Sequence, residues 1–440
     1  SDFMDEHQIN IRMFRPMESY QKYGGVLTFA RSVGYAVVKK PEGYTTAKVD
    51  QIIQEYEKKS ANEQQSTAKQ DPNIITVVNE TFADIKVLGD FKTNEDYMPY
   101  FHSLKKNCVT GYTYASIVGG QTANTEFELL TGNTLGFLSA GTTAFQLYIH
   151  GQMPSLVSNL KAEGYSGNKA MHPFNPYNYN RPAVYKDFGF TDFIDKFDFP
   201  KNVKRVREYI SDEANVDRII SEYEKNRKKT DQPFYMYNMT IQNHSPYDKD
   251  AANFKQPIKI ESSKYDAEAN RYLNLIKYSD DSLKQLTSYF EKCKEPTIIL
   301  FLGDHQPRLT DEFMNKITNG QYQTWSSEQM MKRYQVPFVI WANYDIKEQH
   351  IEKTSMNYIQ SILTQTAGVK MTGYQRFLNE VRKEVPTITS QGYWGKNGKF
   401  YQINDKGSPY YGIIQKYRMI QYNMMFDKKN RRDSFFEVSK

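Results

Sequence analysis

The 440-residue chain has few cysteines, few histidines and no long apolar run. Two isolated cysteines, Cys108 and Cys293, exclude a disulfide framework and a cysteine-based zinc site. No stretch of about 18 consecutive apolar residues occurs, so we expect no membrane-spanning segment, and no signal peptide is visible at the start. The net charge of +6 is modest for this length. It favours an anionic substrate or lipid surface, and we expect no nucleic-acid partner.

Aromatic residues are abundant, at 14% of the chain. They argue against disorder because they can bury enough apolar area to offset chain entropy. Apolar runs at residues 74–78, 296–302 and 336–342 alternate with helical patterns such as 265–293 and 356–367. This alternation predicts an α/β fold with a mostly parallel central sheet and helices on both faces. In such sheets, ligands bind just beyond the carboxyl ends of the strands.

Composition divides the chain into three parts. Residues 1–70 are polar, contain a charged helix from about residue 46 to 69, and are interpreted as an N-terminal arm or linker. Residues 71–369 hold the alternating strands and helices and form the predicted catalytic domain. Residues 370–440 are rich in tyrosine and glycine, and they predict a small C-terminal α+β subdomain that ends in a helix at 413–426.

Five short polar segments stand where predicted strands end, and the first carries Glu80. This residue lies in Asn79-Glu80-Thr81, directly after the strand at 74–78. A carboxylate in that position can hold a hard cation. Alternatively, it caps the helix that follows.

The second segment is Gly119-Gly120-Gln121-Thr122, which leads into a helix. The free amides and the dipole of a helix N-terminus suit a phosphate, and a threonine there can be a nucleophile if a metal lowers the pKa of its hydroxyl. The alternative is an ordinary helix cap formed by Thr122 or Asn124, with Glu126 or Glu128 stabilising the first turn.

The third and fourth segments supply two histidines and an arginine. Arg181 can bind a phosphate bidentately, and His172 can hydrogen-bond a phosphate oxygen or a leaving group. The alternative for this segment is a surface loop whose tyrosines pack. His244 stands in Asn243-His244-Ser245-Pro246-Tyr247 after the strand at 233–240. It is otherwise an ordinary loop residue beside a turn-forming proline.

The fifth segment places Asp304 and His305 directly after the apolar run 298–302. An oxygen and a nitrogen ligand side by side suit Mn, Zn or Fe, and burying both is costly unless something pairs with them. Together the five segments provide a carboxylate, a hydroxyl, the Asp-His pair, two further histidines and an arginine. This set predicts metal-assisted phosphoryl or sulfuryl transfer.

The order and spacing of these segments over residues 70–370 resemble the lipoteichoic acid synthases of the alkaline phosphatase and sulfatase superfamily. The motifs that carry the resemblance are Asn79-Glu80-Thr81, Gly120-Gln121-Thr122 with Glu126, the block from His172 through Asn180-Arg181 to Tyr185, Asn243-His244-Ser245-Pro246-Tyr247, and Gly303-Asp304-His305. The resemblance implies one divalent metal, Mn²⁺ with Mg²⁺ or Zn²⁺ as alternatives, bound by Glu80, Thr122, Asp304 and His305. It implies that Thr122 is the nucleophile, that His172, Arg181 and His244 hold the phosphate, and that Tyr179 stands where the synthases carry tryptophan.

The resemblance also implies a setting. Members of the family are anchored by N-terminal membrane helices and face the outside, so we expect a missing anchor and the extracellular face of a bacterial membrane. The implied donor is an anionic phospholipid such as phosphatidylglycerol, and the implied acceptor is a glycolipid or a polymer end. Phe174 replaces the acidic residue that contacts glycerol in the synthases. With Tyr179, it leaves the identity of the transferred group open.

The resulting hypothesis is a two-step transfer through a covalent Thr122 intermediate, with His244 or His172 protonating the leaving lipid alcohol. A phosphodiesterase, a phosphatase or another transferase of the superfamily, for example of phosphoethanolamine, is an alternative. A sulfatase of this fold needs a formylglycine made from Cys or Ser, whereas this chain has Thr122. A catalytically inactive binding domain is the last alternative, and the intact ligand set argues against it.

Overall fold

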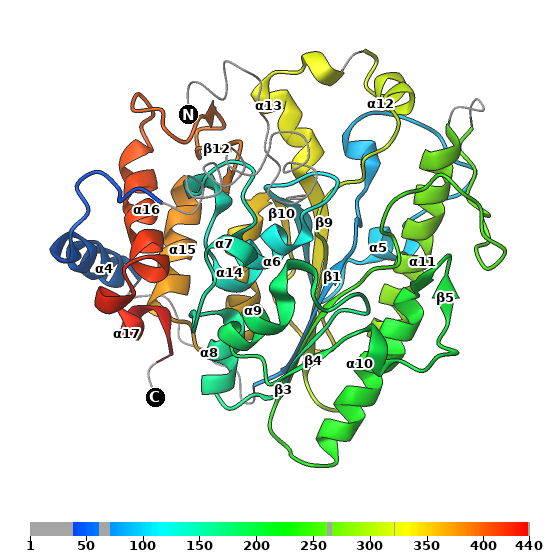
Figure 1. Ribbon diagram of the computed structural model, residues 1–440, viewed down its shortest axis with the longest axis horizontal. Coiled ribbons are helices and arrows are strands. Elements are labelled where there is room, and N and C mark those ends of the chain that lie inside the picture. Colours follow the sequence, from blue (N-terminus) through cyan, green and yellow to red (C-terminus); the bar gives the residue numbers. More distant parts are fainter. Residues whose placement is uncertain (1–37, 61–70, 262–265, 321, 439–440) are drawn as a thin grey trace, which may run out of the picture.

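The computed structural model describes residues 38–60, 71–261, 266–320 and 322–438. An eight-stranded sheet with the order β10-β2-β9-β8-β1-β7-β3-β4 lies at its centre (Figure 1). Its strands are β1 (Asn73–Asn79), β2 (Cys108–Tyr114), β3 (Ser166–Met171), β4 (Asp192–Ile194), β7 (Phe234–Met239), β8 (Thr297–Gly303), β9 (Gln335–Ala342) and β10 (Gln349–Ser355). β9 is antiparallel to both of its neighbours, and the other neighbouring pairs are parallel. The predicted α/β fold with a mostly parallel sheet is confirmed.

Helices cover both faces of this sheet. In Figure 1, α6 (Thr122–Thr131) and α14 (Met356–Ala367) lie on one side, and α10 (Asp212–Arg227) and α11 (Ala267–Phe290) lie on the other. α6 packs against α14, and α10 packs against α11. Because both faces are covered, β1 and β8 are buried along their whole length. This double burial explains why their sequences are predominantly apolar and do not alternate between apolar and polar residues.

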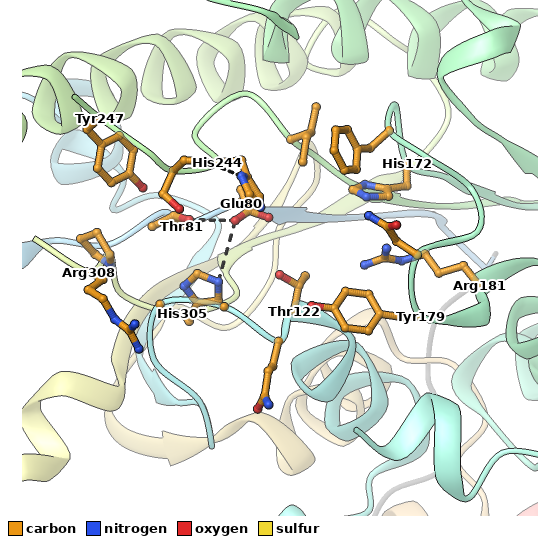
Figure 2. A pocket seen from close by; sticks show the side chains of 18 of the residues that line it. Glu80, Thr81, Thr122, His172, Tyr179, Arg181, His244, Tyr247, His305 and Arg308 are labelled. Atoms are coloured by element: carbon orange, nitrogen blue, oxygen red, sulfur yellow. Dashed lines mark hydrogen bonds and ion pairs between the residues drawn. The ribbon is translucent and has the colours of Figure 1, made fainter. Parts of the chain in front are cut away.

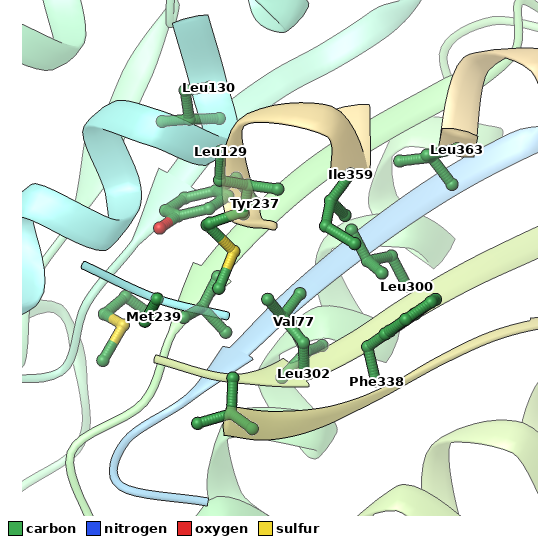
Figure 3. Packing of buried hydrophobic residues seen from close by; sticks show 14 of the residues in the cluster. Val77, Leu129, Leu130, Tyr237, Met239, Leu300, Leu302, Phe338, Ile359 and Leu363 are labelled. Atoms are coloured by element: carbon green, nitrogen blue, oxygen red, sulfur yellow. The ribbon is translucent and has the colours of Figure 1, made fainter. Parts of the chain in front are cut away.

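The core beneath α6 and α14 fixes these helices on the sheet (Figure 3). Val77 of β1 and Leu300 of β8 belong to the same buried cluster as Leu129 of α6 and Ile359 of α14. Complete burial of one such side chain contributes about 1.5–3 kcal/mol. This packing therefore holds α6 firmly, together with Thr122 at its first position.

The sequence pattern identified the apolar elements and missed three strands of the large sheet, β2, β4 and β10. The predicted apolar strands correspond to β1, β7, β8 and β9, and α14 has the predicted bounds. β2 contains threonines and a glycine, and β10 is a polar strand at the edge of the sheet with several exposed side chains. Such strands are held by pairing with their neighbours, so they carry little hydrophobic signal.

The first described helix packs against the C-terminal part of the chain. α4 (Thr46–Ser60) contacts α15 (Gly373–Glu384) and α16 (Tyr411–Met425) and buries Val49 and Ile52. The described part of the helix expected at residues 46–69, Thr46–Ser60, is therefore docked onto the body of the protein. The rest of the predicted arm, residues 1–37 and 61–70, lies outside the described residues.

The C-terminal segment combines helices and a small sheet, as expected. Its elements are α15, β11 (Thr387–Thr389), β12 (Gly392–Trp394), β13 (Phe400–Tyr401), α16 and α17 (Asp433–Phe436), and the three strands pair antiparallel. Residues of this segment share one buried cluster with the large sheet. The domain boundaries at 70 and 369 stay predictions. In the part of the chain that the structure describes, no helix has both the length and the apolar character needed to cross a bilayer.

Candidate active site

The loops that follow β1, β3, β7 and β8 border one pocket at the carboxyl edge of the sheet (Figure 2). Seven of the eight predicted site residues line this cavity of about 460 Å³: Glu80, Thr122, His172, Tyr179, Arg181, His244 and His305. The eighth, Asp304, is buried next to Glu80 and His305. Parallel strands end at the same edge, which brings together residues that are more than 200 positions apart in the sequence.

Glu80, Asp304 and His305 form a compact buried cluster whose ligand atoms all lie within 4.8 Å of one another. The amides of Thr81 and His305 donate to Asp304 Oδ1 at 2.7 and 2.8 Å. His305 Nδ1 lies 2.9 Å from the Gln306 carbonyl oxygen, so Nδ1 carries the hydrogen and Nε2 presents a lone pair to the cluster.

Two buried atoms of this cluster have no hydrogen-bond partner among the described residues. They are Asp304 Oδ2 and His305 Nε2, which lie 3.2 Å apart. Burial raises the pKa of Glu80 to about 8, and the negative charge of Asp304 acts in the same direction. Two close carboxylates and an imidazole lone pair in a buried position fit a divalent cation that accepts mixed oxygen and nitrogen ligands.

The end of β8 explains how Glu80 comes so close to Asp304. Asn79 of β1 pairs with Gly303, the last residue of β8. A Cβ atom at Gly303 would lie 1.8 Å from the carbonyl oxygen of Phe82, so only glycine allows the loop after β1 to cross the strand end at this distance. The Gly303 backbone therefore fixes the spacing between the two ligand loops.

Thr122 is the first residue of α6, and its hydroxyl does not cap the helix. The N-cap residue is Gln121, which has a left-handed backbone (φ 67°) and forms no side-chain cap. Glu126 and Glu128 are fully buried and bind other side chains, so the alternative of a plain helix cap is wrong. Thr125 Oγ1 donates to the Asp304 carbonyl at 2.8 Å, which ties the first turn of α6 to the loop that carries Asp304 and His305.

Arg181 is 1% exposed and is held by Glu126 of α6. Its Nε and Nη2 donate to Glu126 Oε1 at 3.1 and 2.6 Å. The hydroxyls of Tyr185 and Tyr237 donate to the other carboxylate oxygen, Oε2. Glu126 therefore orients the arginine and balances its charge. From the sequence, the position of Glu126 in the first turn of a predicted helix indicated only an interaction with the helix dipole.

The two histidines differ in their surroundings. His172 is buried, and its Nδ1 donates to the Met239 carbonyl at 2.9 Å, so Nε2 presents a lone pair. Burial, reinforced by the Arg181 charge, holds the pKa of His172 well below its usual range. His244 is partly exposed, its Nδ1 donates to the Ser245 carbonyl at 2.6 Å, and its ring stacks on Phe174 with 6.1 Å between the ring centroids.

A family profile described as Sulfatase matches residues 72–369, a range that contains all eight of these residues. The chain belongs to the sulfatase family. This family lies in the alkaline phosphatase and sulfatase superfamily to which the sequence motifs pointed.

Two curated relatives and one solved structure show what this sulfatase-family chain is similar to. A Rhizobium meliloti protein whose name refers to cyclic beta-1,2-glucan modification is 30% identical over 433 residues, 97% of this chain and 65% of that protein. The Bacillus subtilis protein named lipoteichoic acid synthase-like YvgJ is 27% identical over 237 residues, 53% of this chain and 36% of that protein. The structure of Streptococcus pyogenes phosphoglycerol transferase GacH in complex with sn-glycerol-1-phosphate has a TM-score of 0.73 at 21% identity, covering 91% of this chain and 100% of that chain. The chain spans less than two thirds of the length of either curated relative.

Several pocket residues of this sulfatase-family member were not singled out from the sequence. They include Gln146 and Arg308. Arg308 is exposed and lies on the opposite side of the pocket from Arg181 (Figure 2). No local pattern distinguishes an amide or an arginine at a pocket rim from one on the surface. The four-residue distance of Arg308 from Asp304 was the one signal available for it.

Proposed function

We propose that the chain transfers a phosphoglycerol-type group from a lipid headgroup phosphodiester to an alcohol, through a covalent intermediate on Thr122. The observation that carries the proposal is the shared pocket of Thr122, the cluster of Glu80 and His305, and Arg181. A hydroxyl nucleophile, a cation site and an anion-binding arginine are the parts that phosphoryl transfer needs. The names of YvgJ and GacH support this chemistry.

Glu80, Asp304 and His305, together with the Thr122 hydroxyl, would hold one divalent cation. Mn²⁺ is the first choice, with Mg²⁺ or Zn²⁺ as alternatives. Such a cation, when bound, lowers the pKa of a neighbouring hydroxyl and neutralises phosphate charge.

In the first step, the Thr122 hydroxyl gives its proton to solvent, its oxygen forms a bond to phosphorus, and the bond from phosphorus to the lipid alcohol oxygen breaks. The Arg181 guanidinium and the amides at the start of α6 stabilise the equatorial phosphate oxygens. The departing lipid alkoxide takes a proton. His244 in its protonated form supplies it from Nε2, because Nδ1 is engaged with the Ser245 carbonyl.

In the second step, an alcohol acceptor forms a bond to phosphorus, the bond from phosphorus to the Thr122 oxygen breaks, and the Thr122 oxygen takes up a proton from solvent. The lone pair on His172 Nε2 accepts the proton of the acceptor hydroxyl, because the ring is neutral and Nδ1 is already a donor. A phosphate oxygen is itself an acceptor, so it cannot bind that lone pair. This assignment differs from the phosphate-holding role that the family resemblance implies for His172.

The pocket lining favours a glycerol headgroup over ethanolamine. Among the described residues that line it, Glu80 is the sole carboxylate, and Glu80 belongs to the cation cluster. An ammonium group would find no free carboxylate there and would face Arg308. A polyol finds amides and hydroxyls, from Gln121, Gln146, Asn178, Ser245 and Tyr179. These amides take over the contact with glycerol that an acidic residue makes in the synthases, at the position where this chain has Phe174.

The setting of the reaction follows from the donor. A lipid headgroup stays at the membrane surface, so the enzyme works there, on the extracellular face of a bacterial membrane. A glycolipid or a polymer end in the cell envelope then serves as the acceptor. The Rhizobium relative, named for glucan modification, is consistent with a carbohydrate acceptor.

The test is the intact mass of the protein after incubation with Mn²⁺ and phosphatidylglycerol, beside phosphatidylethanolamine and beside Thr122→Ala. We expect a phosphoglycerol adduct with phosphatidylglycerol alone, and none in Thr122→Ala. An adduct that persists in Thr122→Ala would exclude Thr122 as the nucleophile. An adduct from phosphatidylethanolamine would overturn the headgroup assignment, and no adduct from a folded, Mn²⁺-loaded protein would overturn the proposed transfer.

A further inference from the structure

The loop that carries His244 is fastened by one side chain from another part of the fold. Arg207 Nη2 donates to the carbonyl oxygens of Gln242 and His244, each at 2.8 Å. Arg207 Nη1 donates to the Pro246 carbonyl oxygen at 2.7 Å. One guanidinium thus binds three alternate residues of the loop, with His244 in the middle, and its planar fork is suited to such a set of acceptors.

Arg207 is itself held in place by its surroundings. It occupies the turn between β5 (Arg205–Val206) and β6 (Tyr209–Ile210), with φ 55° in the left-handed region. Asn253 accepts from the Arg207 amide at 3.1 Å and donates to its carbonyl oxygen at 2.9 Å. A non-glycine residue in this conformation is strained and persists only where the surroundings determine it.

The hairpin of β5 and β6 also contacts the imidazole of His244. The Tyr209 ring lies 5.7 Å from the His244 ring between centroids, and its Oη lies 3.4 Å from Nδ1. The Arg207 guanidinium lies over the rings of Tyr209 and Tyr247, at 5.2 and 5.8 Å from their centroids. Arg207 does not line the pocket. Its charged group therefore meets loop carbonyls and aromatic faces, and of the three residues whose carbonyls it binds, His244 is the one that lines the pocket.

We propose that Arg207 is a positioning residue that sets the orientation of His244 by fixing the backbone on both sides of it. The inference rests on the proposed function, in which His244 gives a proton to the leaving lipid alcohol. Arg207 stands outside every sequence motif described above. Its contribution to transfer should therefore vanish whenever the proton from His244 is not needed.

The test compares two donors that differ in their leaving group. Phosphatidylglycerol in detergent micelles releases a lipid alcohol that must be protonated. A p-nitrophenyl diester of glycerol phosphate releases a phenolate that needs no proton. We expect Arg207→Ala to lower kcat about 10- to 100-fold with the lipid, within the range that general acid catalysis contributes, and to leave the nitrophenyl reaction within about twofold. Arg205→Ala, in the same hairpin, is the matched control, because Arg205 binds the carbonyl of Glu208 in its own turn and should behave as wild type.

A double-mutant cycle separates positioning from a general effect on the fold. In a His244→Ala background, Arg207→Ala should cause no further loss with the lipid donor, because the two residues act as one unit. Equal slowing with both donors, or losses that multiply in the double variant, would overturn the inference.

Hydrogen exchange tests the inference without turnover. The amides of residues 241–247 should exchange faster in Arg207→Lys than in wild type or Arg205→Ala, because a lysine ammonium lacks the planar fork with which Nη1 and Nη2 of Arg207 span the three carbonyls. This variant also serves if Arg207→Ala fails to fold. Unchanged exchange in Arg207→Lys would refute the role of Arg207. Failure of the wild-type protein to use either donor would refute the proposed function. Hydrogen exchange would then still test whether Arg207 fixes the loop that carries His244.

Discussion

Replacing Glu126 by alanine should both destabilise the fold and disturb the position of Arg181 in the pocket. The carboxylate is completely buried and accepts hydrogen bonds from Arg181, Tyr185 and Tyr237. Its removal leaves a guanidinium whose side chain is 2% exposed without its counter-charge. It also leaves two buried tyrosine hydroxyls without their acceptor.

The magnitude follows from these contacts. Removing one partner of a buried ion pair costs about 3–5 kcal/mol, and a buried hydroxyl without a partner costs about 1–3 kcal/mol. Since water can enter the space left by the carboxylate, these costs overlap, and we expect a total of about 4 kcal/mol. That is a large share of the free energy of unfolding of a natural domain, which is about 5–15 kcal/mol.

Urea denaturation of wild type, Glu126→Ala and the double variant Arg181→Met with Glu126→Leu measures this cost. An apolar pair of similar volume should recover the part of the lost stability that comes from the uncompensated buried charge, whereas the hydroxyls of Tyr185 and Tyr237 still lack their acceptor. The double variant should nevertheless form no adduct with phosphatidylglycerol, because it lacks the phosphate-binding guanidinium. A loss below about 1 kcal/mol for Glu126→Ala, or a double variant as unstable as the single one, would show that the pair is not an isolated buried charge pair.

Two further predictions concern the cation cluster. Gly303→Ala should weaken Mn²⁺ binding measured by calorimetry, because the added Cβ would lie 1.8 Å from the Phe82 carbonyl oxygen and push Glu80 away. Gly412→Ala is the control and should bind Mn²⁺ as wild type does, because no atom lies within 4 Å of its added Cβ. Equal Mn²⁺ affinities of the two variants would contradict the close approach at Gly303. The pKa of Glu80 is raised from 4.5 to about 8, so its protonated form contributes stability to the metal-free protein below about pH 4.5 that is lost as the pH rises through about 8. Mn²⁺ should therefore raise Tm more at pH 8 than at about pH 6, and a pH-independent shift in thermal melts would refute this.

The sequence by itself determined the apolar centre of the sheet and the places along the chain where the candidate site residues stand. The strands β1 and β8 are mostly apolar and are buried at every position, which is the pattern of strands covered on both faces. Glu80, Asp304 and His305 directly follow these strands, and parallel strands bring such residues to one edge. These conclusions rest on local patterns and on a rule of topology, so a single sequence was enough for them.

Only the tertiary structure shows how the candidate site side chains are held in position by residues from other parts of the chain. Glu126 looked like a helix-dipole residue, and its contact with Arg181 depends on how α6 packs on the sheet. Arg207 binds the loop of His244, and α4 packs against α15 and α16, and both contacts join segments far apart in the chain. Such contacts depend on the relative placement of distant elements, and no local periodicity records that placement. The positions of the reactive groups can therefore be deduced from the sequence, whereas their orientation and charge balance arise from packing.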